Sequence, residues 1–211
     1  SRSPLDSLEE KKLIEITSLP EIEVREKSVV ADIRHRVCLD IDSAEEPVLK
    51  QDLFAQYSVN GTWDRRLATY LKMIGSLAEE GTVLILAPNV LRAEELVGIV
   101  EEELDLVALS YHSDLTDGEI SSRWNLAFTE DVDVYVGVLS AAYLPISRMK
   151  GIIVEGDGDR NYDLTEQDPK GNLVKTARKR AELESVPFVV GGTGPSVQSY
   201  KQVTGGKLAS I

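Results

Sequence analysis

Thr82-Val83-Leu84-Ile85-Leu86-Ala87 and Gly151-Ile152-Ile153-Val154 are two continuous apolar runs of strand length. Such runs are typical of strands that helices cover on both faces. Further strands are expected at 53–58, 106–110, 132–138 and 187–190. Amphipathic runs of helix length alternate with the strands, at 64–80, 91–103, 117–128, 172–184 and after Pro195. This alternation predicts an α/β domain with a mostly parallel sheet flanked by helices.

The composition restricts the classes of protein that the chain can represent. Among 211 residues, 23 Lys and Arg stand against 36 Asp and Glu, and the formal net charge of −13 argues against a large phosphate-binding face. The single cysteine, Cys38, excludes an internal disulfide and a cysteine-rich metal site. No apolar run approaches the ~18 residues of a membrane span. We therefore expect a cytoplasmic protein without a membrane partner.

Two parts of the chain differ in pattern. Residues 1–50 are charged and weakly periodic, and we interpret them as an N-terminal appendage or linker. Residues 51–211 carry the regular alternation of strands and helices. In parallel sheets the chemistry lies at the carboxyl ends of the strands, so the residues that follow each strand are the candidates for a site.

The loop after the first strand, 58–66, is compared with a phosphate-binding loop. Such a loop needs glycines followed by Lys and Ser or Thr, because backbone N–H groups and the lysine hold the phosphates. Here Asn60, Gly61 and Thr62 are followed by the bulky Trp63, and no lysine is present. A plain strand-to-helix turn capped by Thr62 or Asp64 is the favoured interpretation.

The loop after the fifth strand is acidic. Four carboxylates, those of Glu155, Asp157, Asp159 and Asp163, occur within nine residues, and the spacing on to Asp168 resembles a calcium loop. Tyr162 stands where a calcium loop has glycine, and the preceding segment is a strand rather than a helix. A solvated acidic loop is therefore favoured over a divalent-cation site.

Three further segments have both a structural and a functional interpretation. His112 follows a strand and is expected to be a structural hydrogen-bonding residue rather than a catalytic one. The glycine-rich segment 191–196 can hold an anion on its backbone amides or simply make a tight turn. Lys175 and Lys179 share a helix face, which we expect to be solvated, with Glu182 and Glu184 as partners, rather than a nucleic-acid patch. No Cys/His or Ser/His/Asp set emerges from the spacing.

Taken together, four segments resemble the PriA (primosomal protein N′) family of ATP-dependent DNA helicases. Residues 112–120 (HSDLTDGEI) are similar to the family's His-Ser-Gly-Leu-Ser-Asp-Gly-Glu-Arg, and residues 136–145 (VGVLSAAYLP) to its Ile-Gly-Thr-Arg-Ser-Ala-hydrophobic-Phe-Ala-Pro. Residues 155–162 (EGDGDRNY) resemble its Asp-Glu-Glu-His-Asp followed by Tyr, and residues 191–199 (GGTGPSVQS) its Gly-Ser-Ala-Thr-Pro-Ser-hydrophobic-Glu-Ser. The resemblance covers about 53–211. It implies that 51–211 form the first RecA-like helicase lobe, a fold of the P-loop NTPase type.

The family's chemical residues are replaced in this chain. Glu155 and Gly156 stand where the family has the Asp that holds magnesium and the Glu that activates water. Residues 138–139 (VL) replace its Thr-Arg, and residues 192–194 (GTG) replace its Ser-Ala-Thr. The pattern resembles the degenerate primosomal N′ proteins of actinobacteria and implies a pseudo-helicase that does not use the family's ATP and Mg²⁺. We assign no catalytic residue and no metal ligand.

The resemblance nevertheless implies positions for two remnant sites. The degenerate nucleotide-binding remnant comprises Asn60, Gly61, Thr62, Glu155, Asp157 and Asp159. The implied DNA contacts are Ser140, His112 and Thr193.

The expected function is that of a component of replication restart and DNA replication. It binds forked DNA, weakly in this chain alone, and it binds replication or primosome proteins. One alternative is a protein-interaction module without DNA affinity. Another is a divalent-metal or nucleotide-binding enzyme that uses the acidic loop 155–163. The family's N-terminal DNA-binding region, zinc region and second lobe are not recognised in the sequence, so we expect a fragment or a reduced version of a longer protein.

Overall fold

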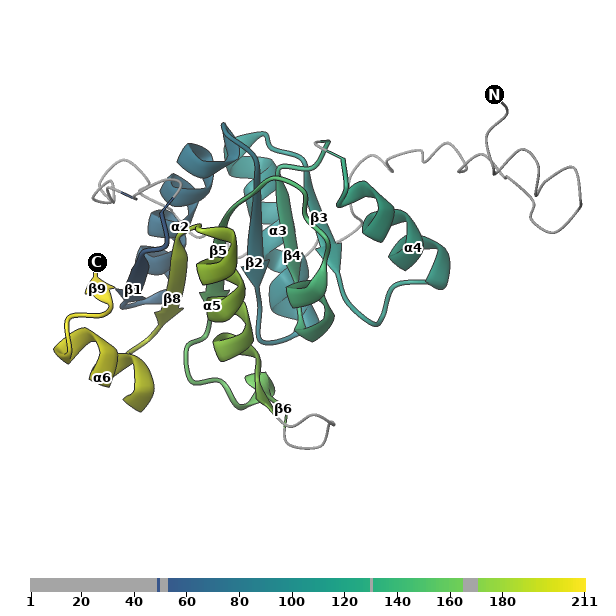
Figure 1. The fold of residues 1–211 in the computed structure, drawn as a ribbon. Helices are drawn as coiled ribbons and strands as arrows, with labels where there is room; N and C mark the ends of the chain where they lie inside the picture. Colours follow the sequence, from purple (N-terminus) through teal and green to yellow (C-terminus); the bar gives the residue numbers. More distant parts are fainter. Residues whose placement is uncertain (1–48, 50–52, 130, 165–170) are drawn as a thin grey trace, which may run out of the picture.

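The computed structural model describes residues 49, 53–129, 131–164 and 171–211 (Figure 1). The predicted appendage 1–50 falls outside the described residues except for Leu49, and so does Asp168 of the calcium-like spacing. The boundary between the appendage and the lobe stays a prediction.

A seven-stranded sheet in the order β3-β4-β2-β5-β8-β1-β9 forms the centre of the described part. Every pair of neighbouring strands in it is parallel, which confirms the predicted fold class. The strands are β1 Gln56–Asn60, β2 Thr82–Leu86, β3 Ala108–Tyr111, β4 Val134–Gly137, β5 Met149–Glu155, β8 Phe188–Gly192 and β9 Ala209–Ser210. Two short antiparallel strands, β6 Asp163–Leu164 and β7 Gly171–Asn172, pair outside this sheet.

The helices lie close to their predicted ranges. They are α2 Trp63–Ala78, α3 Val90–Leu104, α4 Asp117–Leu126, α5 Leu173–Glu184 and α6 Val197–Thr204, with 3₁₀ turns η1 Leu139–Tyr143 and η2 Arg160–Tyr162. The predicted capping box is present, because Glu119 N donates to Thr116 Oγ1 and Thr116 N donates to Glu119 Oε2. Of the two predicted caps of α2, Thr62 takes the N-cap position but its side chain makes no capping hydrogen bond, and Asp64 lies inside the first turn of the helix.

Two hydrophobic layers cover the sheet, as the continuously apolar strands predict. Val83 and Ile85 of β2 face one layer together with α2 and α3. Leu84 and Leu86 face the other layer together with η1 and α5. Figure 1 shows α2 and α3 behind the sheet and α5 in front of it. Because successive strand residues point to opposite faces, both sets are buried only in a sheet covered on both sides.

Helix α4 is the exception to this layering. None of its residues is buried, and it lies beyond β3, the edge strand of the sheet (Figure 1). The hydrophobic runs of the sequence did not distinguish this edge helix from the helices that cover the faces.

The ends of two strands depend on close backbone approach. A Cβ atom on Gly137 would lie 2.3 Å from Tyr111 O and 2.4 Å from the Cβ of Ala141, so only glycine lets η1 fold tightly over β4.

The helices of the described residues include none whose length and apolar character would allow it to span a membrane.

Candidate functional site

The carboxyl ends of three adjacent strands meet at the candidate site. Strands β5, β8 and β1 are neighbours in the sheet, and their ends carry the loops that begin at Glu155, Gly192 and Asn60. Gly61 N donates to Gly192 O at 3.2 Å, and Asp157 N donates to Gly191 O at 2.6 Å. The three loops that the sequence singled out are therefore joined by backbone hydrogen bonds.

Glu155 forms a buried ion pair with Arg66 of α2. The residue is only 3% exposed at the end of β5. Its Oε1 accepts a hydrogen bond from Arg66 Nη2 at 2.5 Å, and its Oε2 accepts one from Arg66 Nε at 3.3 Å and one from Tyr70 Oη at 2.7 Å. Arg66 Nη1 also donates to Gly61 O at 2.6 Å. We call these three side chains the Arg66–Glu155–Tyr70 cluster.

Local structure explains how the cluster assembles. Arg66 and Tyr70 are four residues apart on α2, so both point to the same side of the helix. A Cβ atom on Gly191 would lie 1.5 Å from Tyr70 Oη, so the tyrosine fits only against a glycine in β8. At this position the glycine-rich segment therefore serves close packing.

Tyr162 supports the cluster from the opposite layer. Its hydroxyl donates to the backbone oxygen of Glu155 and, at 3.1 Å, to that of Leu86. The ring is buried in the hydrophobic layer that contains α5. The end of β5 is thus held by hydrogen bonds both at its side chain and at its backbone.

Burial and charge act together on the ionisable groups. Burial, followed by the charge of Glu155, raises the pKa of Tyr70 well above its ordinary value. Burial and the same carboxylate raise the pKa of Tyr162 as well. For Arg66, burial lowers the pKa, but the hydrogen bond and charge of Glu155 outweigh it, and the pKa is raised. The cluster therefore holds a cation, an anion and a neutral phenol.

The start of α2 differs from a phosphate-binding loop in its chemistry. A phosphate loop brings glycine, lysine and a hydroxyl residue to the helix start, whereas α2 begins with Trp63, Asp64 and Arg65. The Trp63 ring lies under the guanidinium of Arg92, with 4.0 Å from its Cζ to the ring centroid. The Asp64 carboxylate lies in the first turn of α2. Its negative charge interacts with the positive end of the helix dipole, where a bound phosphate would otherwise lie.

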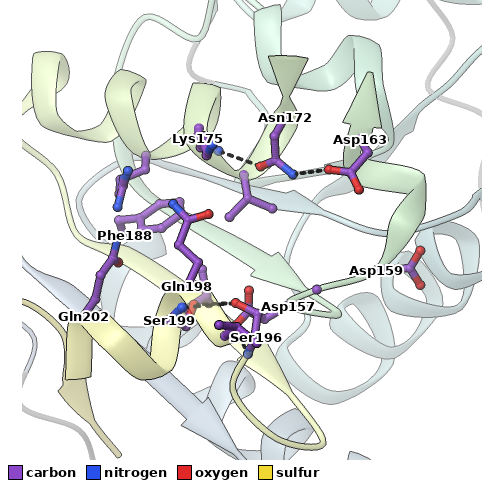
Figure 2. Close-up of a pocket in the computed structure, with 15 residues that line it drawn as sticks. Asp157, Asp159, Asp163, Asn172, Lys175, Phe188, Ser196, Gln198, Ser199 and Gln202 are labelled. Atoms are coloured by element: carbon purple, nitrogen blue, oxygen red, sulfur yellow. Dashed lines mark hydrogen bonds between the residues drawn. The ribbon is translucent and has the colours of Figure 1, made fainter. Parts of the chain in front are cut away.

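Asp157 and Asp159 lie on the other side of the sheet from the Glu155 carboxylate. Asp157 Oδ2 accepts a hydrogen bond from Ser196 N at 2.9 Å, and Asp159 Oδ1 accepts one from Asn161 N at 2.9 Å. Both aspartates line a cavity of about 240 Å³ together with Lys175 of α5. Figure 2 shows Asp157 beside Ser196, with Lys175 on the neighbouring helix.

The three predicted remnant carboxylates, Glu155, Asp157 and Asp159, therefore do not converge. Within the described ranges, no group of three or more His, Cys, Asp and Glu side chains is placed to hold a metal ion. The prediction of a solvated acidic loop is only partly right, because Asp157 and Asp159 are half-buried and hydrogen-bonded. Tyr162, at the sixth position of the calcium-like spacing, is a core residue.

The remaining residues of the predicted site lie at the same edge of the sheet. Asn60 and Gly61 are half-buried, Thr62 is exposed, and Asn60 Nδ2 donates to Ser58 Oγ. Among the implied DNA contacts, Ser140 and Thr193 are exposed after β4 and β8, with strands β2 and β5 between them.

His112 is 5% exposed, and its Nε2 lies 2.6 Å from Glu94 Oε1. In this conformation its imidazole is not available at the surface. This placement agrees with a structural histidine, whereas its contact with DNA stays a prediction.

The basic segment of α5 agrees with the solvated-helix interpretation. Lys179 pairs with Glu182 at 2.9 Å, and Arg180 pairs with Glu184 at 2.7 Å. Both glutamates are exposed.

Sequence reasoning did not find the partners of Glu155. Arg66 and Tyr70 each directly precede a leucine of the apolar stripe on α2, Leu67 and Leu71. A charged residue and a tyrosine four positions apart, next to an apolar helix stripe, indicate that both side chains are partly buried and need polar partners. Nothing in the spacing connects them to a carboxylate that lies 89 positions after Arg66 and 85 positions after Tyr70.

The chain is similar in sequence to replication restart proteins named PriA. It is 25% identical to that of Synechocystis sp. over 206 residues, 96% of this chain and 25% of the relative. It is 22% identical to that of Thermotoga maritima over 212 residues, 100% of this chain and 27% of the relative. The chain thus spans about a quarter of the length of these curated relatives. No protein-family model matches it.

Solved helicase domains share the fold. The C-terminal domain of the DEAD-box protein Dbp5 covers 76% of this chain and 91% of its own length, with a TM-score of 0.53 at 14% identity. The yeast DEAD-box splicing factor Prp28 covers 74% of this chain and 41% of its own, with a TM-score of 0.54 at 14% identity. The predicted similarity to PriA proteins and the predicted RecA-like fold are confirmed. The assignment of this chain to the first of two lobes stays a prediction.

Breaking the buried ion pair is expected to destabilise the domain strongly. Arg66→Met leaves the Glu155 carboxylate buried without its cation and should lower the free energy of unfolding by about 3–5 kcal/mol. Arg66→Met combined with Glu155→Met should recover much of that loss, because no charge stays buried. Urea denaturation measures both variants. Lys179→Met in the exposed pair is the control, with an expected change below about 1 kcal/mol. A loss of similar size for Arg66→Met and Lys179→Met would contradict the prediction.

Alkaline pH is expected to destabilise the domain through its buried tyrosines. The pKa of Tyr70 and that of Tyr162 are raised in the folded state, so their contribution to stability is complete below the unfolded-state pKa of about 10 and is lost as the pH rises toward the folded values. The free energy of unfolding, measured by urea denaturation from about pH 9 to about pH 11, should fall above about pH 10. Tyr70→Phe should reduce that slope, whereas exposed Tyr143→Phe should leave it unchanged. An equal slope in all three proteins would refute this assignment.

Proposed function

We propose that this chain is a RecA-like lobe of a replication-restart protein similar to PriA, and that it supports assembly at forked DNA without hydrolysing ATP. The observation that carries the proposal is the Arg66–Glu155–Tyr70 cluster, which occupies the strand end where the family's magnesium-binding acid is expected. The lobe serves as a scaffold that keeps the helicase fold.

Sequence similarity supports the restart role. The similarity to PriA proteins extends over nearly the whole chain, and the four motif segments occur in the family's order. That order also favours the first lobe over the second, since these segments resemble motifs of the first lobe. The role of the complete relatives reaches this chain only as part of the proposal, because the chain covers about a quarter of their length.

The charged residues at the strand ends support the loss of ATP chemistry. Phosphoryl transfer depends on magnesium and on cations that stabilise the phosphate oxygens. Magnesium binds through carboxylate oxygens, but both oxygens of Glu155 accept hydrogen bonds from inside the protein. The 58–66 loop has no lysine, and Asp64 adds negative charge at the start of α2. Removing Arg66 from Glu155 to admit a metal would leave the guanidinium itself without its partner.

Nucleotide binding and hydrolysis test the proposal. Calorimetric titration with Mg²⁺, Ca²⁺ and Mg·ATP should give no binding heat, and hydrolysis with forked DNA should stay at background. A PriA protein with the complete family motifs is the positive control under the same conditions. The contrary result is DNA-stimulated hydrolysis that Glu155→Gln abolishes while circular dichroism shows a folded protein. Binding of Mg²⁺ or Ca²⁺ that Asp157→Asn removes would instead favour the enzyme built on the acidic loop.

Salt-dependent DNA binding separates the scaffold from a pure interaction module. The net charge of −13 and the buried His112 favour a module without DNA affinity, whereas exposed Ser140 and Thr193 favour weak binding at the carboxyl edge of the sheet. We expect binding of forked DNA that weakens steeply from about 50 mM to about 200 mM salt. Ser140→Glu and Thr193→Glu should each weaken it, but Ser147→Glu before β5, at the opposite edge, should not. If no binding is measurable at the lower salt, the interaction module is the better description.

A further inference from the structure

Helix α4 presents two large aromatic side chains to solvent. Trp124 is 39% exposed and Phe128, just after the helix, is 59% exposed. Phe128 follows the C-cap residue Ala127 in a turn in which Phe128 N donates to Asn125 O at 3.2 Å, so both aromatic residues belong to the C-terminal end of the helix. No residue of α4 is buried, and the helix lies outside the edge strand β3 (Figure 1). Exposed aromatic residues in pairs are typical of contact surfaces rather than of a solvated helix.

Other residues of α4 attach it to the domain. Ile120 and Leu126 pack against the hydrophobic layer that contains η1 and α5. Arg123 Nη1 donates to Ser110 Oγ at 2.7 Å and to the backbone oxygen of the same residue. Tyr135 Oη donates to Arg123 O at 3.1 Å. Ile120, Arg123 and Leu126 therefore hold α4 on the domain, whereas Trp124 and Phe128 leave part of their surface to solvent.

Acidic residues flank α4 in the sequence. Asp114 before the helix, Asp117 at its start and Asp131 after it are exposed, and Glu119 and Asp133 are half-buried. Arg123, the basic residue of the described segments 113–129 and 131–133, points inward to Ser110. These described segments therefore carry five acidic residues against one basic residue, a balance that attracts a basic partner and repels phosphate groups.

We infer that the outer face of α4, centred on Trp124 and Phe128, is a docking site for a basic amphipathic segment of another protein. The aromatic side chains supply the apolar contact that dominates binding energy at interfaces. The aspartates complement the charge of the partner and speed its association. A second copy of this chain is disfavoured, because both copies carry a charge of −13. The inference does not depend on the proposed function, since α4 is separate from the Arg66–Glu155–Tyr70 cluster.

A designed peptide tests the docking site on the full chain. The probe is a fluorescently labelled helix of leucine and lysine, with leucines spaced to form one apolar face. Its controls are a scrambled peptide of equal composition and a leucine–glutamate peptide of the same pattern. Fluorescence anisotropy should show binding of the basic amphipathic peptide, with affinity at least about tenfold weaker for each control. The unlabelled peptide, which contains no tryptophan, should shift the fluorescence emission of Trp124. The Trp63→Phe variant, in which Trp124 is the remaining tryptophan, should show the same shift.

Variants locate the binding. Trp124→Ala and Phe128→Ala should each weaken the peptide affinity by about tenfold or more. Asp117→Asn together with Asp131→Asn should weaken it severalfold and reduce its salt dependence. Tyr143→Ala and Leu183→Ala remove exposed apolar side chains near η1 and on α5, and they should leave binding unchanged. Phe128, Tyr143 and Leu183 are more than half exposed, so thermal unfolding should stay the same in their variants. Circular dichroism checks that Trp124→Ala is folded.

The inference is overturned by any of three results. The first is equal binding of the amphipathic and scrambled peptides, which would mean unspecific charge attraction. The second is binding that Trp124→Ala and Phe128→Ala leave intact. The third is a dimer in analytical ultracentrifugation that Phe128→Ala dissociates, which would make a second copy the occupant.

Discussion

The hydrogen-bonded ion pair between Arg66 and Glu155 is the interaction on which the arrangement of the strand ends depends. It links β5, in the centre of the sheet, to α2, and through Gly61 O it also fixes the turn between β1 and α2. Two charges in a dry environment are tolerated only when each satisfies the other. The residues around them, Tyr70 above all, are therefore constrained by this pair rather than by packing alone.

The fold was predictable because its signals are local. Continuous apolar runs such as 82–87 show that both faces of the sheet are covered, and the capping box at Thr116 gives a helix start. The strand boundaries shifted: β1 begins at Gln56 rather than at residue 53. The two-residue strands β6, β7 and β9 were not predicted, because pairs that short have no periodicity and depend on contacts with distant segments.

The site was predictable only in part, for the opposite reason. Motif resemblance placed Glu155 and the loops around it correctly at one edge of the sheet. It grouped Glu155 with Asp157 and Asp159, although β5 ends at Glu155 and Gly156 turns the chain with a positive φ. Asp157 and Asp159 therefore belong to the loop, where they accept hydrogen bonds from Ser196 N and Asn161 N. The true partners of Glu155 come from α2, and no local pattern reports an ion pair between residues so far apart in sequence.

The contact between Tyr70 and Gly191 has an evolutionary consequence. Any larger residue at position 191 collides with Tyr70. Any loss of Arg66 leaves the Glu155 carboxylate buried without its cation. A substitution at one of these four positions is therefore harmful until its partner has also changed. Their side chains are expected to change together in evolution, because each single replacement passes through a destabilised protein.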